Sequence, residues 1–115
     1  MAEKAGDVTV YGLKACDTCR AAVRALTAAG HTVRLVDVRA EPLEDGLRAR
    51  FLATFGEALV NRRSTTWRAL SEEDRAHPPE RLLADHPALM KRPVIVTGDA
   101  LHLGWDAGVK AALGL

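Results

Sequence analysis

Apolar and polar positions near the N-terminus predict a strand, a helix and a second strand. Residues 8–11 are mostly β-branched or aromatic and stop at Gly12, which is typical of a short strand ending in a turn. From Asp17, a suitable N-cap, apolar residues recur at helical spacing until Gly30. Residues 32–38 are again β-rich. These segments predict one βαβ unit with parallel strands and a right-handed crossover.

Between residues 41 and 91 the strand pattern disappears and helical spacing recurs. Ser71 precedes three acidic residues, which is typical of a capped helix start, because carboxylates in the first turn favour the helix dipole. Apolar positions keep helical register in three further stretches, residues 43–55, 66–70 and 79–84. We therefore expect a helical insert of about residues 41–91.

A second pair of strands follows the insert. Residues 93–97 and 100–103 are β-rich, and Gly98 and Asp99 between them form a two-residue loop of the kind that closes a hairpin. Residues 106–113 carry apolar positions at helical spacing and are expected to cover a sheet face. The element order is therefore βαβ, a helical block, then ββα.

That order is the order of an α/β, thioredoxin-like fold with helices inserted in the middle. The chain shows no repeat, linker or low-complexity segment. We expect residues 1–115 to form a single domain, with its core in about residues 8–40 and 92–115.

Net charge and the length of the apolar runs argue against nucleic-acid-binding and membrane-spanning proteins. With 16 Lys and Arg against 15 Asp and Glu, the formal net charge is +1, so the chain lacks the basic excess typical of nucleic-acid-binding proteins. No apolar run approaches the roughly 18 residues needed to cross a bilayer. Residues 1–7 mix charges of both signs and do not resemble a secretory signal. We expect a soluble, cytoplasmic monomer that binds neither nucleic acid nor a membrane.

Both cysteines lie in one CxxC motif where the first predicted strand leads into the first predicted helix. The helix dipole and the unpaired backbone N–H groups favour the thiolate of Cys16, and Lys14 and Arg20 are candidates to add positive potential. Cys19 lies one turn further along the same helix face, near the separation that a disulfide needs. This arrangement favours Cys16 as the nucleophile and Cys19 as the resolving thiol.

Two other interpretations of the cysteines stay open. Free cysteines are often small buried hydrophobic residues with no chemical role. A structural zinc site is the other alternative, but it needs four ligands, and we expect no metal. The histidines show no paired ligand spacing: they are His31, His77, His86 and His102.

Three segments resemble the arsenate reductase (ArsC) and Spx group of thioredoxin-like proteins. They are residues 11–22, which contain the CxxC motif, residues 61–70 with sequence Asn-Arg-Arg-Ser-Thr-Thr-Trp-Arg-Ala-Leu, and residues 87–96 with an Arg-Pro pair. Their order and spacing match the group over nearly the whole chain, most closely its uncharacterised reductase-like branch. The resemblance implies a mixed four-stranded sheet with a helical insertion, and arginines that converge on the nucleophilic cysteine.

The resemblance assigns residues to an oxyanion site. By position, Arg63 or its neighbour Arg62 would be the mid-chain arginine and Arg92 the arginine before the proline. A guanidinium suits this role because it keeps its charge and binds an oxyanion or carboxylate with two hydrogen bonds. The resemblance also implies that Thr18 and Pro93 shape the active site, with a cis peptide bond before Pro93.

The region after the hairpin departs from the arsenate-reducing pattern. Residues 101–106 contain no arginine, and His102 is a weaker donor, so the sequence does not establish arsenate as the substrate. The resemblance implies a thiol-dependent reductase with a small thiol or oxyanion substrate, no bound cofactor, glutathione as co-substrate and glutaredoxin as a partner. The alternative is a Spx-like regulator that binds RNA polymerase and uses the CxxC disulfide as a switch.

Overall fold

The computed structural model describes residues 6–115, and the polar segment of residues 1–5, for which the sequence predicts no secretory signal, lies outside that range. The chain divides into two compact units. The first combines the N-terminal part up to Asp37 with Arg92–Leu115, and the second is Val38–Lys91. These boundaries lie within a few residues of the predicted insert, and folding as a single domain stays a prediction.

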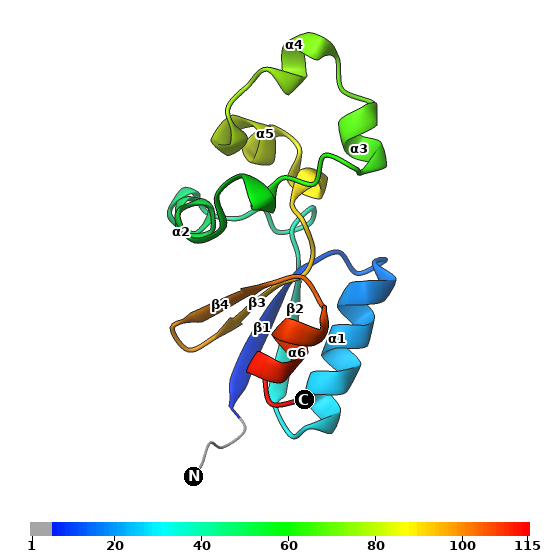
Figure 1. The fold of residues 1–115 in the computed structure, drawn as a ribbon, viewed down its shortest axis with the longest axis vertical. Helices are drawn as coiled ribbons and strands as arrows, with labels where there is room; N and C mark the ends of the chain where they lie inside the picture. The colour runs from blue at the N-terminus through cyan, green and yellow to red at the C-terminus, as the bar shows by residue number, and fades with distance from the viewer. Residues whose placement is uncertain (1–5) are drawn as a thin grey trace. The chain divides into compact units, whose positions relative to one another are not determined.

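The first unit contains a mixed four-stranded sheet with the order β2-β1-β3-β4 (Figure 1). β1 pairs in parallel with β2, with Val8 opposite Val33, and β3 is antiparallel to both of its neighbours. The strands are β1 (Asp7–Gly12), β2 (Thr32–Asp37), β3 (Val94–Thr97) and β4 (Ala100–Leu103). The predicted α/β sheet, its parallel βαβ unit and its closing hairpin are therefore confirmed.

Helices α1 (Asp17–Ala28) and α6 (Ala107–Ala112) pack their apolar residues against one core cluster of the sheet. The cluster consists of Val8, Val10, Ala22, Leu26 and Ile95, and it is joined by half-buried residues that include Trp105, Val109 and Leu113. Both helices are therefore placed by burial of an amphipathic face, as the sequence predicts.

The start of α1 differs from the prediction by one residue. The N-cap is Cys16, not Asp17, because Cys16 has an extended backbone and its carbonyl already accepts the Arg20 N–H at 3.0 Å. Asp17 is the first helical residue, and its carboxylate pairs with the Arg20 guanidinium at 2.6 Å. The helix ends before Gly30, which has a φ of +98° that suits glycine.

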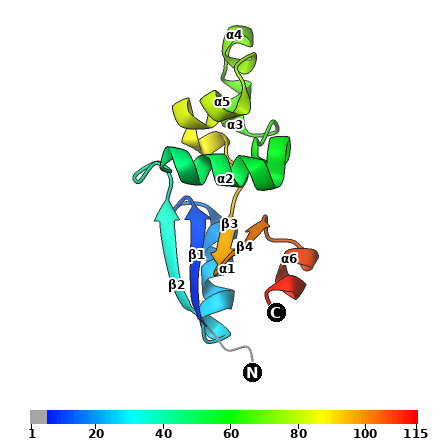
Figure 2. The ribbon, with the colours of Figure 1, turned by 90° about the vertical axis from the view of Figure 1, so that its left-hand side faces the viewer.

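The second unit consists of short helices (Figure 2). Ser64 and Ser71 cap two of them by accepting backbone N–H groups at 3.1 and 3.0 Å. The helices are α2 (Asp45–Phe55), α3 (Thr65–Arg68), α4 (Glu72–Arg75) and α5 (Pro79–Asp85), with the 3₁₀ turns η1 (Gly56–Leu59) and η2 (Pro87–Leu89). The predicted helical character of the insert is confirmed, including the cap at Ser71.

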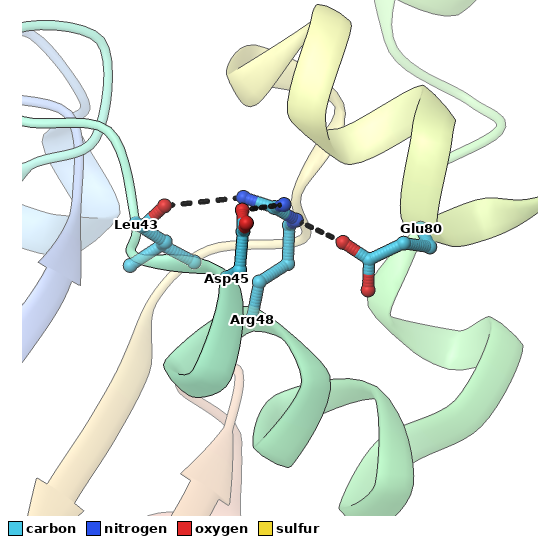
Figure 3. A network of polar contacts seen from close by, with 4 residues as sticks. All are labelled: Leu43, Asp45, Arg48 and Glu80. Carbon is cyan, nitrogen blue, oxygen red and sulfur yellow. Dashed lines mark hydrogen bonds and ion pairs between the residues drawn. The ribbon is translucent and has the colours of Figure 1, made fainter.

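A buried arginine ties α2 to α5 within the second unit (Figure 3). Arg48 is 8% exposed, and its guanidinium donates to the Leu43 carbonyl at 3.1 Å and to the Asp45 carboxylate at 2.6 Å. Its Nε donates to the Glu80 carboxylate on α5. Three acceptors therefore satisfy a charge that would be costly to bury alone.

None of the helices in the described part of the chain is both long and apolar enough to span a membrane.

Candidate active site

The end of β1 and the start of α1 place the two cysteines. The chain turns after Gly12, where the Cys16 N–H donates to the Leu13 carbonyl at 3.1 Å, and α1 begins at the next residue. Cys16 is therefore half-buried at the helix N-terminus, whereas Cys19 is fully buried in the first helical turn. Both are free thiols.

The surroundings of Cys16 stabilise its thiolate. Burial alone raises the pKa of this thiol, because it disfavours the charged form. Hydrogen bonds to the sulfur act the other way: two come from Cys19, through its backbone N–H and its thiol, one from the Arg92 guanidinium and one from the Thr18 backbone N–H. Together they hold the pKa of Cys16 below its ordinary value of 9.0, as the helix-start position predicts.

Cys19 has the opposite character. Burial raises the pKa of the Cys19 thiol to about 11, and the neighbouring Cys16 adds to the rise through its charge and its hydrogen bond. The Leu13 backbone N–H and the Arg92 charge oppose this rise without cancelling it. The pair therefore consists of one thiol that ionises easily and a protonated thiol beside it.

The register of the sheet brings Arg92 and Pro93 to this site. β1 and β3 are antiparallel with Tyr11 opposite Val94, so the register continued by one residue places Gly12 beside Pro93. The Arg92–Pro93 peptide bond is cis, as the resemblance implies. Pro93 is buried, and its carbonyl accepts the Gly104 N–H at 2.8 Å.

Thr18 contributes through its backbone. Its side chain is exposed, and the group that stabilises the Cys16 thiolate is its N–H. The structure thus brings together Cys16, Cys19, Thr18, Arg92 and Pro93 of the predicted site residues. Their roles in a reaction stay predictions.

Arg62 and Arg63 belong to the second unit, where they line an open pocket. Arg62 is already engaged, because its guanidinium pairs with Glu57 at 2.8 Å and lies 5.2 Å from the ring centre of Trp67. The Arg63 backbone N–H donates to the Asn61 side chain at 3.0 Å, but no described residue bonds its guanidinium. Of the two arginines, Arg63 is therefore the better anion-binding candidate.

Main-chain pairing assembles this pocket. Val60 and Met90 form an antiparallel bridge, flanked by hydrogen bonds from the Asn61 N–H to the Leu89 carbonyl at 2.8 Å and from the Lys91 N–H to Leu59 at 2.7 Å. The bridge sets two chain segments side by side, so that the pocket is lined by Ala58, Val60, Asn61, Arg62, Arg63 and Lys91. Lys91 is a cationic lining residue that sequence reasoning missed.

The two basic residues nearest to the cysteines in sequence, Lys14 and Arg20, are both exposed. The Arg20 guanidinium pairs with Asp17, and neither side chain is among the groups that shift the pKa of Cys16. His102, the weaker donor in the segment that lacks an arginine, is half-buried on β4 opposite Ile95 and is not among the groups that shift this pKa either.

A glycine that the sequence did not single out as functional, Gly12, lies against the Cys19 sulfur. A Cβ atom built on Gly12 would overlap the Cys19 sulfur. The strand-ending pattern gives no signal of this contact, because it depends on how α1 packs against β1. Within residues 6–115, no three His, Cys, Asp or Glu side chains gather as metal ligands would.

Comparisons with known proteins agree with this fold. The model of the ArsC family matches residues 11–112. An uncharacterised protein of Haemophilus influenzae (strain ATCC 51907 / DSM 11121 / KW20 / Rd) is 36% identical over 106 residues, covering 86% of this chain and 91% of its own.

Two solved structures share both fold and sequence. The YFFB protein is 30% identical with a TM-score of 0.82, covering 91% of this chain and 96% of its own. An arsenate reductase (ArsC) related protein from Brucella melitensis is 32% identical with a TM-score of 0.73, covering 99% of this chain and 100% of its own. The fold is thus the thioredoxin-like fold that the element order predicts, and the chain belongs to the ArsC family.

Proposed function

We propose that this protein is a thiol-dependent reductase in which Cys16 attacks an oxidised sulfur and glutathione supplies the electrons. The observation that carries the proposal is the contrast between the two thiols: Cys16 is half-buried with a lowered pKa, and Cys19 is buried beside it with a raised one. A thiolate is the attacking form in thiol–disulfide exchange, and a neighbouring thiol can resolve the product.

The reaction balances with these groups alone and two molecules of glutathione. The Cys16 thiolate attacks one sulfur of a substrate disulfide, forms a mixed disulfide and expels the other half as a thiolate. Cys19 loses its proton to that leaving thiolate and attacks the Cys16 sulfur, which releases the second substrate thiol and leaves a Cys16–Cys19 disulfide. Two glutathione molecules then reduce this disulfide and become oxidised glutathione, so two electrons pass from glutathione to the substrate.

The pKa of Cys19 supports this order of events. Part of its rise comes from the charge of Cys16, and that charge disappears once Cys16 is bonded to the substrate. Cys19 therefore stays protonated while Cys16 attacks, and it becomes easier to ionise when it must resolve the mixed disulfide.

The cationic pocket of the second unit supports binding of an anionic group. Arg63, Lys91 and Asn61 are among its lining residues, and guanidinium, ammonium and amide groups bind carboxylates and oxyanions. Arg62 would join them after leaving Glu57. We propose Arg63 and Lys91 as substrate-binding residues and Arg92 as the group that stabilises the attacking thiolate.

Turnover of cysteine variants tests the proposal. Reduction of a small mixed disulfide of glutathione, followed through NADPH and glutathione reductase, is expected to fall to background in Cys16→Ser. In Cys19→Ser the Cys16 mixed disulfide is expected to accumulate. Full turnover by Cys16→Ser would overturn the proposal.

Arsenate is the second substrate to test, because one similar structure is described as arsenate reductase-related. We expect slow turnover or none, since residues 101–106 supply no arginine. Arg63→Gln and Lys91→Gln are expected to raise the KM for an anionic substrate. Arg24→Gln, on the exposed side of α1, is the matched control and is expected to leave it unchanged.

A redox-controlled regulator is the second candidate function. The pair of free thiols one helical turn apart favours it, because such a pair can switch between dithiol and disulfide. Co-purification of the chain with the RNA polymerase α subunit, lost in Cys16→Ser, would support the regulator. An intact disulfide switch without polymerase binding would rule it out.

A further inference from the structure

We propose that Gly12 is a positioning residue for the Cys16 thiolate, acting through Cys19. Its missing side chain leaves the space that the Cys19 sulfur occupies, and Cys19 in turn supplies two hydrogen bonds to Cys16. This inference rests on the proposed function only in that the Cys16 thiolate is taken as the reacting group.

Of the described atoms near position 12, only the Cys19 sulfur would be overlapped by an added Cβ. A Cβ at position 12 would overlap Cys19 Sγ, whereas it would lie 3.4 Å from Cys19 Cβ and 3.9 Å from Arg92 Cβ, which are ordinary contact distances. The sulfur cannot move aside into solvent, because Cys19 has no exposed surface. Close packing therefore makes even one methyl group at position 12 displace the thiol.

Backbone conformation does not explain the glycine. Gly12 is a β1 residue paired with Asp37, and its φ is not positive, so alanine fits the backbone there. Gly46 in α2 makes a matched comparison, because its φ is not positive either and an added Cβ meets nothing within 4 Å. The space around the Cys19 sulfur is thus what requires glycine at position 12.

Displacement of the Cys19 sulfur would reach Cys16 directly. The Cys19 thiol and its backbone N–H are among the groups that lower the pKa of Cys16, and Arg92, another of them, borders the same position. Moving the thiol weakens at least one of these hydrogen bonds, so it reduces the fraction of Cys16 present as thiolate.

Four proteins test the inference as a double-mutant cycle: wild type, Gly12→Ala, Cys19→Ala and the double variant. The readouts are the pH dependence of Cys16 alkylation by iodoacetamide, located by mass spectrometry, and the urea midpoint of unfolding. In the wild-type background, Gly12→Ala is expected to slow alkylation about threefold at a pH below the thiol pKa and to lower the midpoint. In the Cys19→Ala background it is expected to change neither, because the methyl group then has room.

Several outcomes would overturn the inference. They are an unchanged Cys16 profile in Gly12→Ala, an equal effect of Gly12→Ala in both backgrounds, and an equal loss from the Gly46→Ala control. If Gly12→Ala does not fold, folding of the double variant supports the inference and its failure to fold overturns it. Alkylation of Cys16 needs no substrate, so the double-mutant cycle tests the role of Gly12 without measuring turnover. Full turnover by Cys16→Ser would therefore overturn the proposed reductase function and leave the result of the cycle unaffected.

Discussion

Two cysteines separated by one helical turn have pKa values shifted in opposite directions, because Cys16 caps the helix and Cys19 is buried in its first turn. Cys16 accepts hydrogen bonds as a thiolate, whereas Cys19 has no contact with water. The CxxC motif at a strand–helix junction was enough to predict the lowered pKa of Cys16 and the lower exposure of Cys19, but not the raised pKa of Cys19. The part played by Gly12 was not predictable, since it depends on a contact formed only when α1 packs on β1.

The raised pKa of Cys19 predicts a pH dependence of stability. Above the ordinary pKa of 9.0 the unfolded thiol loses its proton, but the folded thiol keeps it up to about 11. In that window the folded state binds more protons, so Cys19 lowers the free energy of unfolding by up to about 1.4 kcal/mol per pH unit as the pH rises. Urea unfolding at several pH values should show that the free energy of unfolding falls less steeply with pH in Cys19→Ala than in the wild type. Identical slopes of this free energy against pH in the two proteins would contradict the prediction.

Arg92 is expected to set part of the Cys16 acidity. Arg92→Met removes one hydrogen bond to the thiolate, so the pKa of Cys16 should rise and the thiolate fraction below that pKa should fall about three- to tenfold. The pH dependence of Cys16 alkylation measures this pKa, with Arg24→Met on the exposed face of α1 as the control. Equal profiles for the two variants would show that Arg92 does not act on Cys16.

At the scale of elements, apolar spacing and turn residues predicted the four strands and the α-helices to within a few residues, but not the 3₁₀ turns η1 and η2. The Gly98–Asp99 turn and the serine before α4 are local signals, which is why sequence was sufficient for them. The N-cap of α1 was assigned one residue late, because Asp17 is a common capping residue and cysteine is not. Arg48 was not predicted at all, since its acceptors include Glu80, 32 positions further along the chain.

Arg48 is expected to be the most important polar contact between α2 and α5. Arg48→Met removes hydrogen bonds to three acceptors, and we expect it to lower the free energy of unfolding by about 1–3 kcal/mol. Arg81→Met breaks an exposed pair with Asp85 on α5 and should cost only about 0–0.5 kcal/mol. Urea unfolding of both variants checks this, and equal losses would refute the role of Arg48.

At the scale of the whole molecule, the sequence predicts one domain, and the structure contains two compact units. The chain passes from the first unit to the second after Asp37 and returns to the first at Arg92. The family match over residues 11–112 spans both units. The two thiols lie in the first unit, and the pocket with Arg63 and Lys91 lies in the second. The change from strand to helical patterning placed the predicted insert within a few residues of the second unit. Whether the two units fold as one domain stays a prediction.

The two tryptophans allow the single-domain prediction to be tested, because Trp105 lies in the first unit and Trp67 in the second. Trp67→Phe and Trp105→Phe each leave one fluorescent reporter. If the chain unfolds as one domain, the reporter in each unit should follow the same urea curve as the far-UV circular dichroism of its variant. A fluorescence midpoint separated from the circular dichroism midpoint would show that the units unfold independently.

The most direct test of the whole account is the pKa of the Cys16 thiol in the unmodified protein. We expect the pH dependence of alkylation at Cys16 to give a pKa below the ordinary 9.0, with Cys19 unreactive until the pH approaches about 11. A Cys16 pKa at or above 9.0, or equal reactivity of the two thiols, would contradict the assignment of Cys16 as the activated nucleophile.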